Sequence, residues 1–279
     1  MNVSVGIDVA DERKGLDLVA LDGDRRVVSR CSRATVNDVT TVIAELRPDV
    51  VCIDSPPAWA LRGRSRAAER QLRRLGITAF STPTDPGPHA FYRWMRVGFS
   101  VFTAIADTYP RFRSGLVRGT AVEVFPEASA VLLQGRLRSG HEPKGQFRRR
   151  VLANCGIETT DLTTVDAVDA ALAALTGILA LEETFSTVGD PDEGVIVLPV
   201  RTLPYTPLVR SSRPAMTPPV SATADVGSSG ERLCMCGCRA VVRRRFLPGH
   251  DAKLKSRLLG RRANGDVDAA DQLRELGWG

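Results

Sequence analysis

The order of the predicted elements in residues 1–54 limits the possible folds more than any other feature of the sequence. Val3–Val9 is apolar and β-branched, which predicts a strand, and Gly15–Leu21 predicts a second one. Asp22-Gly23-Asp24 signals a hairpin turn, after which Arg25–Arg30 is expected to form a third strand. These segments predict a meander of three strands at the start of the chain.

The two following segments connect this meander to a parallel strand. Thr35–Leu46 has apolar residues at helical spacing, and Pro48 ends the helix. Val50–Ile53 is short and wholly apolar, which is typical of a strand buried on both faces of a parallel sheet. This order is the opening of an RNase H-like fold, so we expect an α/β protein whose mixed sheet, a meander plus parallel strands, is flanked by helices.

The later elements follow from the same patterns. Pro126 can start a helix, since its missing N–H is no loss in the first turn. Further helices are predicted over Ser65–Leu75, Phe91–Ala106, Gln146–Asn154 and Thr164–Glu183, and further strands over Ala121–Phe125 and Gly194–Leu198.

The composition divides the chain into three parts. Residues 1–200 form the RNase H-like domain, and residues 201–230, with five Pro and nine Ser or Thr, predict a linker. Residues 231–279 form a small Cys-rich module with 11 Lys or Arg against 6 Asp or Glu, within a net charge of +6 for the chain. This basic excess indicates a polyanionic partner such as nucleic acid, unless it reflects an Arg bias of genomic origin.

Two features typical of membrane and exported proteins do not occur in the sequence. No stretch approaches 18 uninterrupted apolar residues, so we expect no membrane span. Met1–Asp8 has no basic region followed by an apolar one, and so differs from a signal peptide. We therefore expect a cytoplasmic protein that has no membrane partner.

Two predicted strands end in an aspartate. Asp8 closes the first strand and Asp54 closes the buried one. Ligand sites in α/β sheets gather at the carboxyl ends of the strands, so parallel neighbours would place these carboxylates side by side. Adjacent carboxylates repel each other, and a divalent cation such as Mg²⁺ or Mn²⁺ would remove that cost.

Three further acids are candidates for the same site. Asp166 and Asp169 are spaced i and i+3, so they share one face of the predicted helix, and small alanines around them permit close approach to the sheet. Glu123 is a charge within an otherwise apolar strand.

Each acid also has an ordinary structural interpretation. Asp8 could cap a turn, Asp54 could start the turn at Ser55, and Glu123 could pair with an arginine. Asp166 could close a capping box with Thr163.

At this point several segments, taken in order, resemble a known family. They resemble the domain of unknown function 429 family, predicted nucleases of RNase H-like fold, over about residues 1–200. The segments are Gly6-Ile7-Asp8 with Lys14-Gly15, Ile53-Asp54-Ser55-Pro56, Ala68-Glu69-Arg70, Trp94-Met95, Glu123-Val124-Phe125-Pro126, Asp166-Ala167-Val168-Asp169-Ala170 and Glu193–Pro199.

This resemblance implies a phosphodiesterase site that holds two divalent cations, one to activate water and one to stabilise the leaving oxygen. By similarity to resolvases of the same superfamily, Asp8 and Asp54 would be metal ligands, and Asp166 and Asp169 would match an acidic pair on a late helix. Glu123 lies in a family motif. Resolvases often have Glu where this chain has Asp54. The shorter side chain of Asp54 would either shift the position of the metal or mean that the site does not use the two-cation mechanism.

Basic residues provide candidate phosphate contacts. Arg66, Arg70, Arg73 and Arg74 lie on one predicted helix, where they would bind phosphates or form a solvated face. In the tail, Arg243, Arg244 and Arg245 would contact phosphates without regard to sequence.

The cysteines of the tail indicate a second metal. Cys234, Cys236 and Cys238 with His250 make a Cys₃His set that suits Zn²⁺, although reduced thiols or redox chemistry are alternatives.

Three functions are compatible with these patterns. The first is a metal-dependent nuclease with a basic tail that contacts nucleic acid. The second is a non-catalytic nucleic-acid-binding or regulatory protein on the same scaffold. The third, an actin-like phosphotransferase, would need Gly-rich phosphate loops, and the sequence has none.

Overall fold

The computed structural model describes residues 2–209 and, beyond them, 232–233, 241–242, 250–263, 269, 273–274, 276 and 278. The chain forms two compact units, Met1–Met216 and Thr217–Gly279. Among the described residues, none of the helices has the length and apolarity that crossing a membrane requires.

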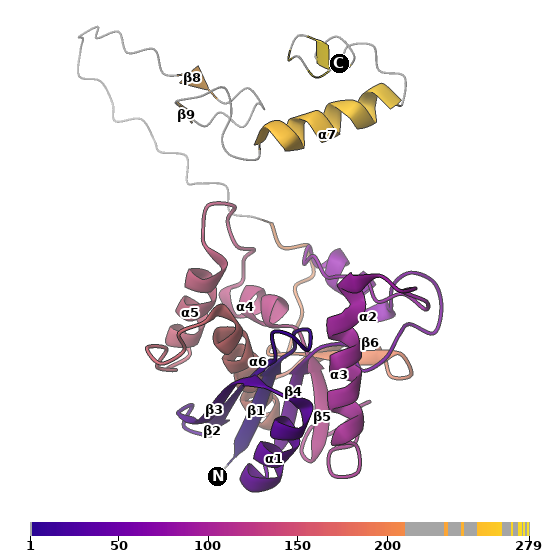
Figure 1. Cartoon of the computed structure of the whole chain (residues 1–279). Coiled ribbons are helices and arrows are strands. Elements are labelled where there is room, and N and C mark those ends of the chain that lie inside the picture. The colour runs from indigo at the N-terminus through magenta and orange to yellow at the C-terminus, as the bar shows by residue number, and fades with distance from the viewer. Residues whose placement is uncertain are drawn as a thin grey trace, which may run out of the picture. The chain divides into compact units, whose positions relative to one another are not determined.

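The first unit is built on a mixed sheet of seven strands in the order β3-β2-β1-β4-β5-β7-β6 (Figure 1). Strands β1, β4, β5 and β7 are parallel, and β2, β3 and β6 run antiparallel to their neighbours. This confirms the predicted mixed sheet. The strands are β1 (Val3–Asp8), β2 (Leu16–Asp22), β3 (Val27–Ala34), β4 (Val50–Asp54), β5 (Thr120–Val124), β6 (Ser186–Asp190) and β7 (Gly194–Leu198).

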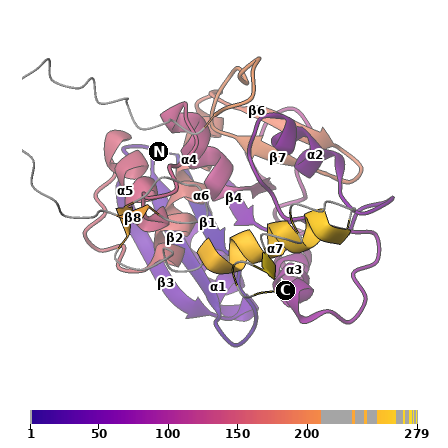
Figure 2. The same cartoon turned by 90° about the horizontal axis from the view of Figure 1, so that it is seen from above.

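Helices cover both faces of the sheet, as predicted. α4, α5 and α6 pack on one face, and α1 and α3 pack on the other (Figure 2). α2 packs against the edge strand β6 and its neighbour β7. The helices are α1 (Val36–Leu46), α2 (Ala67–Arg74), α3 (Arg93–Ala104), α4 (Pro126–Gln134), α5 (Lys144–Asn154) and α6 (Val165–Leu181), with a 3₁₀ turn, η1, at Ala90–Tyr92.

The second unit contains α7 (His250–Ala263) and two short paired strands, β8 (Arg232–Leu233) and β9 (Val241–Val242). Leu254 and Leu258 of α7 pack with Ala269 and Leu273 in a small apolar cluster.

α6 is the central helix of the first unit, and residues 167–180 are buried all round it. It can lie close to the sheet because β1 has Gly6 at the crossing. A Cβ atom at Gly6 would overlap the backbone oxygen of Ala170 and the backbone nitrogen of Ala174. The same crossing fixes where the first turn of α6 lies relative to the end of β1.

Gly6→Ala is expected to lower the free energy of unfolding by about 1–3 kcal/mol, because the added methyl group forces α6 away from β1. Gly140→Ala is the matched control, since a Cβ atom at Gly140 would meet no atom within 4 Å. Urea unfolding of both variants measures the difference. Equal stability of the two would show that α6 does not depend on this close approach.

Candidate functional site

One cavity in the first unit is lined by all five acids that the sequence singled out. It has a volume of about 270 Å³ and lies at the carboxyl ends of β1, β4 and β5. The carboxylates lining it are Asp8, Asp54, Glu123, Asp166 and Asp169, together with Glu69.

Asp8 and Asp54 are brought together by the register of two parallel strands. β1 and β4 pair so that Asp8 lies opposite Asp54, and each is the last residue of its strand. Side chains alternate along a strand, so these carboxylates share the face of Gly6 and Cys52, which α6 covers.

Asp166 and Asp169 reach the same place from the first turns of α6. Thr164 is the N-cap of this helix, and its Oγ1 accepts a hydrogen bond of 3.0 Å from the amide of Ala167. The N-cap is therefore Thr164 and not Thr163, which the alternative interpretation of Asp166 as part of a capping box requires. The Asp166 carboxylate lines the cavity instead. Asp169, one turn further, is buried.

Burial and neighbouring carboxylates act on the two aspartates at the strand ends. Burial, followed by the charges of Asp169 and Asp166, raises the pKa of Asp8 from 3.8 to about 8. Burial, followed by the charges of Asp8 and Asp169, raises the pKa of Asp54 well above its usual value. Burial and the neighbouring charges thus disfavour the bare carboxylates of Asp8 and Asp54, which favours a proton or a cation there.

Three basic side chains supply part of the missing charge. The Nζ atom of Lys14 lies 2.6 Å from Oδ2 of Asp166, and that of Lys144 lies 3.1 Å from Oδ2 of Asp169. Arg148 pairs with Asp169 and, through Nη2 at 2.6 Å, with Glu127. All three of the basic residues line the cavity.

These basic residues had only a weak signal in the sequence. Four of the 38 basic residues are lysines, and two of these four, Lys14 and Lys144, lie in this cavity. Most basic residues of the chain are arginines, so the use of lysine at these two positions of the cavity is the signal that the sequence offers.

The donor set suits a hard divalent cation in its chemistry. Carboxylate oxygens are the ligands that Mg²⁺ and Mn²⁺ prefer, and the raised pKa values of Asp8 and Asp54 show that added positive charge would be favourable. Within the described part of the chain, however, no three His, Cys, Asp or Glu side chains are arranged to hold a metal ion. Asp166 and Asp169 face Lys14, Lys144 and Arg148 instead.

Glu123 occupies a different part of the cavity wall. It pairs with Ile53 in the β4–β5 register, one position before Asp54, so its side chain lies on the opposite face of the sheet from Asp54. There it receives two hydrogen bonds from Arg66, of 2.8 Å from Nη1 and 2.6 Å from Nη2. The structure thus shows Glu123 in the arginine pair that the sequence left as an alternative.

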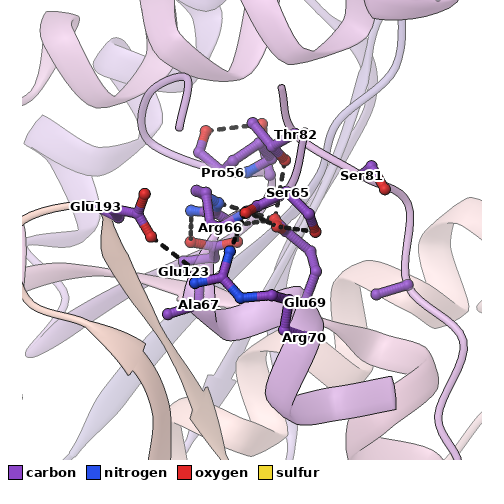
Figure 3. A network of polar contacts seen from close by, with 12 residues as sticks. Pro56, Ser65, Arg66, Ala67, Glu69, Arg70, Ser81, Thr82, Glu123 and Glu193 are labelled. Atoms are coloured by element: carbon purple, nitrogen blue, oxygen red, sulfur yellow. Dashed lines mark hydrogen bonds and ion pairs between the residues drawn. The ribbon is translucent and has the colours of Figure 1, made fainter. Parts of the chain in front are cut away.

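Arg66 is the centre of a buried polar network (Figure 3). Its side chain is 1% exposed, and its Nε donates to Oε1 of Glu69 at 2.8 Å. Glu69 also accepts a hydrogen bond of 2.6 Å from the Arg66 amide, and Glu193 accepts one of 2.9 Å from the Ala67 amide. A helix N-terminus leaves its backbone amides without partners, and Glu69 and Glu193 supply acceptors for those of Arg66 and Ala67. The contacts between Arg66 and Glu123 hold the start of α2 against β5.

The other predicted arginines of α2 lie outside the cavity lining. Arg70 is exposed and donates to the backbone oxygen of Ser65. Arg73 is exposed and donates to Oγ of Ser65 at 2.9 Å and to Oγ of Ser81 at 2.7 Å. Both remain available to solvent, and their proposed phosphate contacts stay predictions.

The predicted tail site falls mostly outside the described residues. Cys234, Cys236 and Cys238 and the run Arg243, Arg244 and Arg245 are not among them, and of His250 the structure describes only its place at the start of α7. The zinc site stays a prediction.

Comparisons with known proteins identify the family. A search of curated proteins and a search of solved structures each find no match for the chain. A family model described as "Protein of unknown function (DUF429)" matches residues 6–193. This range includes the last three residues of β1, all of β2 to β6, and every residue of the cavity described above except Ile196. The chain belongs to the DUF429 family.

Proposed function

We propose that the first unit is a metal-dependent nuclease that hydrolyses phosphodiester bonds. The reaction takes place in the cavity lined by Asp8, Asp54, Asp166 and Asp169, which we call the four-aspartate cavity. The proposal rests on the in-register pair Asp8 and Asp54, with Asp169 approaching from α6. The strand order β3-β2-β1-β4-β5 also supports an RNase H-like core, because that fold opens with a meander followed by parallel strands.

The residues of the cavity have separable tasks in this proposal. Bound divalent cations would supply activation of water and stabilisation of the leaving oxygen. Asp8, Asp54 and Asp169 would hold these cations, and the aspartate pair at the strand ends would fix their position on the sheet. Lys14 and Lys144 supply positive charge at the cavity wall, where a phosphate oxygen can accept hydrogen bonds from them.

A second function is favoured by the ion pairs of the cavity. Lys14, Lys144 and Arg148 already neutralise Asp166 and Asp169, as expected of a nucleic-acid-binding or regulatory protein that works without a metal. The two functions differ in one observable property, which is hydrolysis that depends on a divalent cation.

The test is an assay of labelled single- and double-stranded DNA and RNA with Mg²⁺ or Mn²⁺. Hydrolysis should appear with the cation, stop with a chelator and resume when the cation is returned. Binding of nucleic acid without any such hydrolysis would favour the second function.

A further inference from the structure

Six aromatic side chains form a continuous cluster in residues 59–99. We call Trp59, Phe80, Phe91, Tyr92, Trp94 and Phe99 the aromatic cluster. The chain has only 15 Phe, Trp and Tyr residues, so this cluster holds a large share of them. Its rings meet edge to face, with centroids 4.7 Å apart for Trp59 and Phe99 and 5.1 Å apart for Phe80 and Phe91. Further contacts join Phe80 to Trp94, Phe91 to Tyr92, and Tyr92 to Trp59.

The aromatic cluster is continuous with the four-aspartate cavity. Phe80 and Trp94 line the cavity together with Asp8 and Asp54. Phe80 is nevertheless 61% exposed and Phe91 39% exposed, although phenylalanine side chains are usually buried in the core of a protein. The cluster therefore presents apolar rings to solvent where a substrate would enter.

One arginine contacts a ring of the cluster, and a second lies on the same helix. The guanidinium of Arg96 lies 5.6 Å from the centroid of the Trp59 ring, a cation–π contact, and both Arg93 and Arg96 are exposed on α3. Arg96 thus adds an exposed positive charge to the aromatic cluster. Rings for stacking with nearby cations for phosphates are the combination that binds single-stranded nucleic acid.

We infer that the aromatic cluster binds unpaired bases, so that the site acts on single-stranded rather than double-stranded nucleic acid. This inference rests on the proposed function, since it names the substrate of that site. Bases within a duplex have their faces covered by their neighbours, whereas bases of a single strand can stack on Phe80 and Phe91. The backbone of the same strand then runs toward the carboxylates through the cavity wall at Phe80 and Trp94.

The test is binding without hydrolysis, measured on the full chain with a chelator present. Fluorescence anisotropy reports the affinity for labelled oligothymidylate and oligouridylate of about 12 nucleotides and for a duplex of equal length. Phe80→Ala and Phe91→Ala should each weaken single-strand binding about 5-fold or more, because each removes one stacking surface. Tyr205→Ala is the control, since Tyr205 is 98% exposed and does not line the cavity.

Phe80→Leu separates stacking from general apolar contact. Leucine keeps much of the apolar area but has no π face, so Phe80→Leu should lose as much single-strand affinity as Phe80→Ala. Retained affinity in Phe80→Leu, or equal binding of the duplex, would overturn the inference. The inference would also be overturned if the wild type self-associates, and if Phe80→Ala abolishes that self-association but binds single strands as tightly as the wild type does.

The outcomes also separate this inference from the proposed function. Single-strand binding that depends on Phe80 and Phe91, in a protein that never hydrolyses its ligand, would remove the nuclease and leave the binding site. Cation-dependent hydrolysis that is unaffected by Phe80→Ala and Phe91→Ala would retain the nuclease and remove the aromatic site.

Discussion

Asp8→Asn and Asp54→Asn are each expected to reduce cation-dependent hydrolysis by at least about 100-fold. A metal ion contributes several kcal/mol to such a reaction, and 1.4 kcal/mol corresponds to a factor of ten in rate. Each substitution keeps the shape of the side chain and removes its charge from the paired strand ends. Initial rates at saturating Mg²⁺ or Mn²⁺ measure the loss.

The control for these variants is Asp107→Asn, an exposed aspartate outside the cavity. It should hydrolyse at the wild-type rate. If Asp8→Asn and Asp54→Asn also hydrolyse at that rate, the carboxylates at the strand ends do not carry the reaction.

The stability of Asp8→Asn should change in the direction opposite to its activity. An acid whose pKa is raised from 3.8 to about 8 binds its proton more tightly in the folded state. The contribution of this carboxyl to the stability of the metal-free wild type is therefore fully present below pH 3.8, and it falls by up to about 1.4 kcal/mol per pH unit as the pH rises toward 8. Asparagine has no such charge, so Asp8→Asn should be at least as stable as the wild type at pH 8. A loss of activity can then be separated from a loss of fold.

Arg66→Met is expected to destabilise the first unit by about 3–5 kcal/mol. It removes the buried guanidinium and leaves Glu69 and Glu123 as uncompensated charges in the interior. Burial already raises the pKa of Glu123, and the charge of Arg66 opposes that rise. Urea unfolding of the variant measures the effect.

Two comparisons make the Arg66 prediction specific. Arg74→Met changes an exposed arginine at the end of the same helix and should cost less than about 1 kcal/mol. Adding Glu69→Gln and Glu123→Gln to Arg66→Met should recover part of the loss, because both orphaned charges are then removed. An Arg66→Met variant as stable as Arg74→Met would show that the buried network of Arg66, Glu69 and Glu123 does not stabilise the first unit.

The sequence predicted the sheet well where burial leaves a periodic pattern. The meander, Val50–Ile53 and the helix over Thr164–Glu183 all lie in the predicted places, within a few residues at their ends. β6 was not predicted, because it is an edge strand in which only Val188 is buried and two of its five residues are exposed. An edge strand of this kind has no apolar alternation to detect.

The candidate site was predictable where the backbone alone places the residues. Asp8 and Asp54 follow from parallel strands that end together, and Asp166 and Asp169 follow from helical spacing. The partners of these acids were not predictable in the same way. Lys144 and Arg148 come from α5, and their approach to Asp169 depends on how two helices pack.

Arg66 shows the limit of reading charge from one helix. Its spacing with Arg70 and Arg73 indicates a common basic face, yet Arg66 is the N-cap residue and turns inward to Glu123. Glu123 is 57 residues further along the chain, so only the tertiary structure pairs them.

The central claim is that side chains from β1, β4 and α6 converge to hold a divalent cation. A crystal structure of the full chain grown with Mn²⁺, with anomalous diffraction recorded at the manganese edge, tests it most directly. We expect an anomalous peak in the cavity within coordination distance of both Asp8 and Asp54, and its absence from Asp8→Asn crystals. A cavity without manganese, in which Lys14 and Lys144 keep their contacts to Asp166 and Asp169, would contradict the claim.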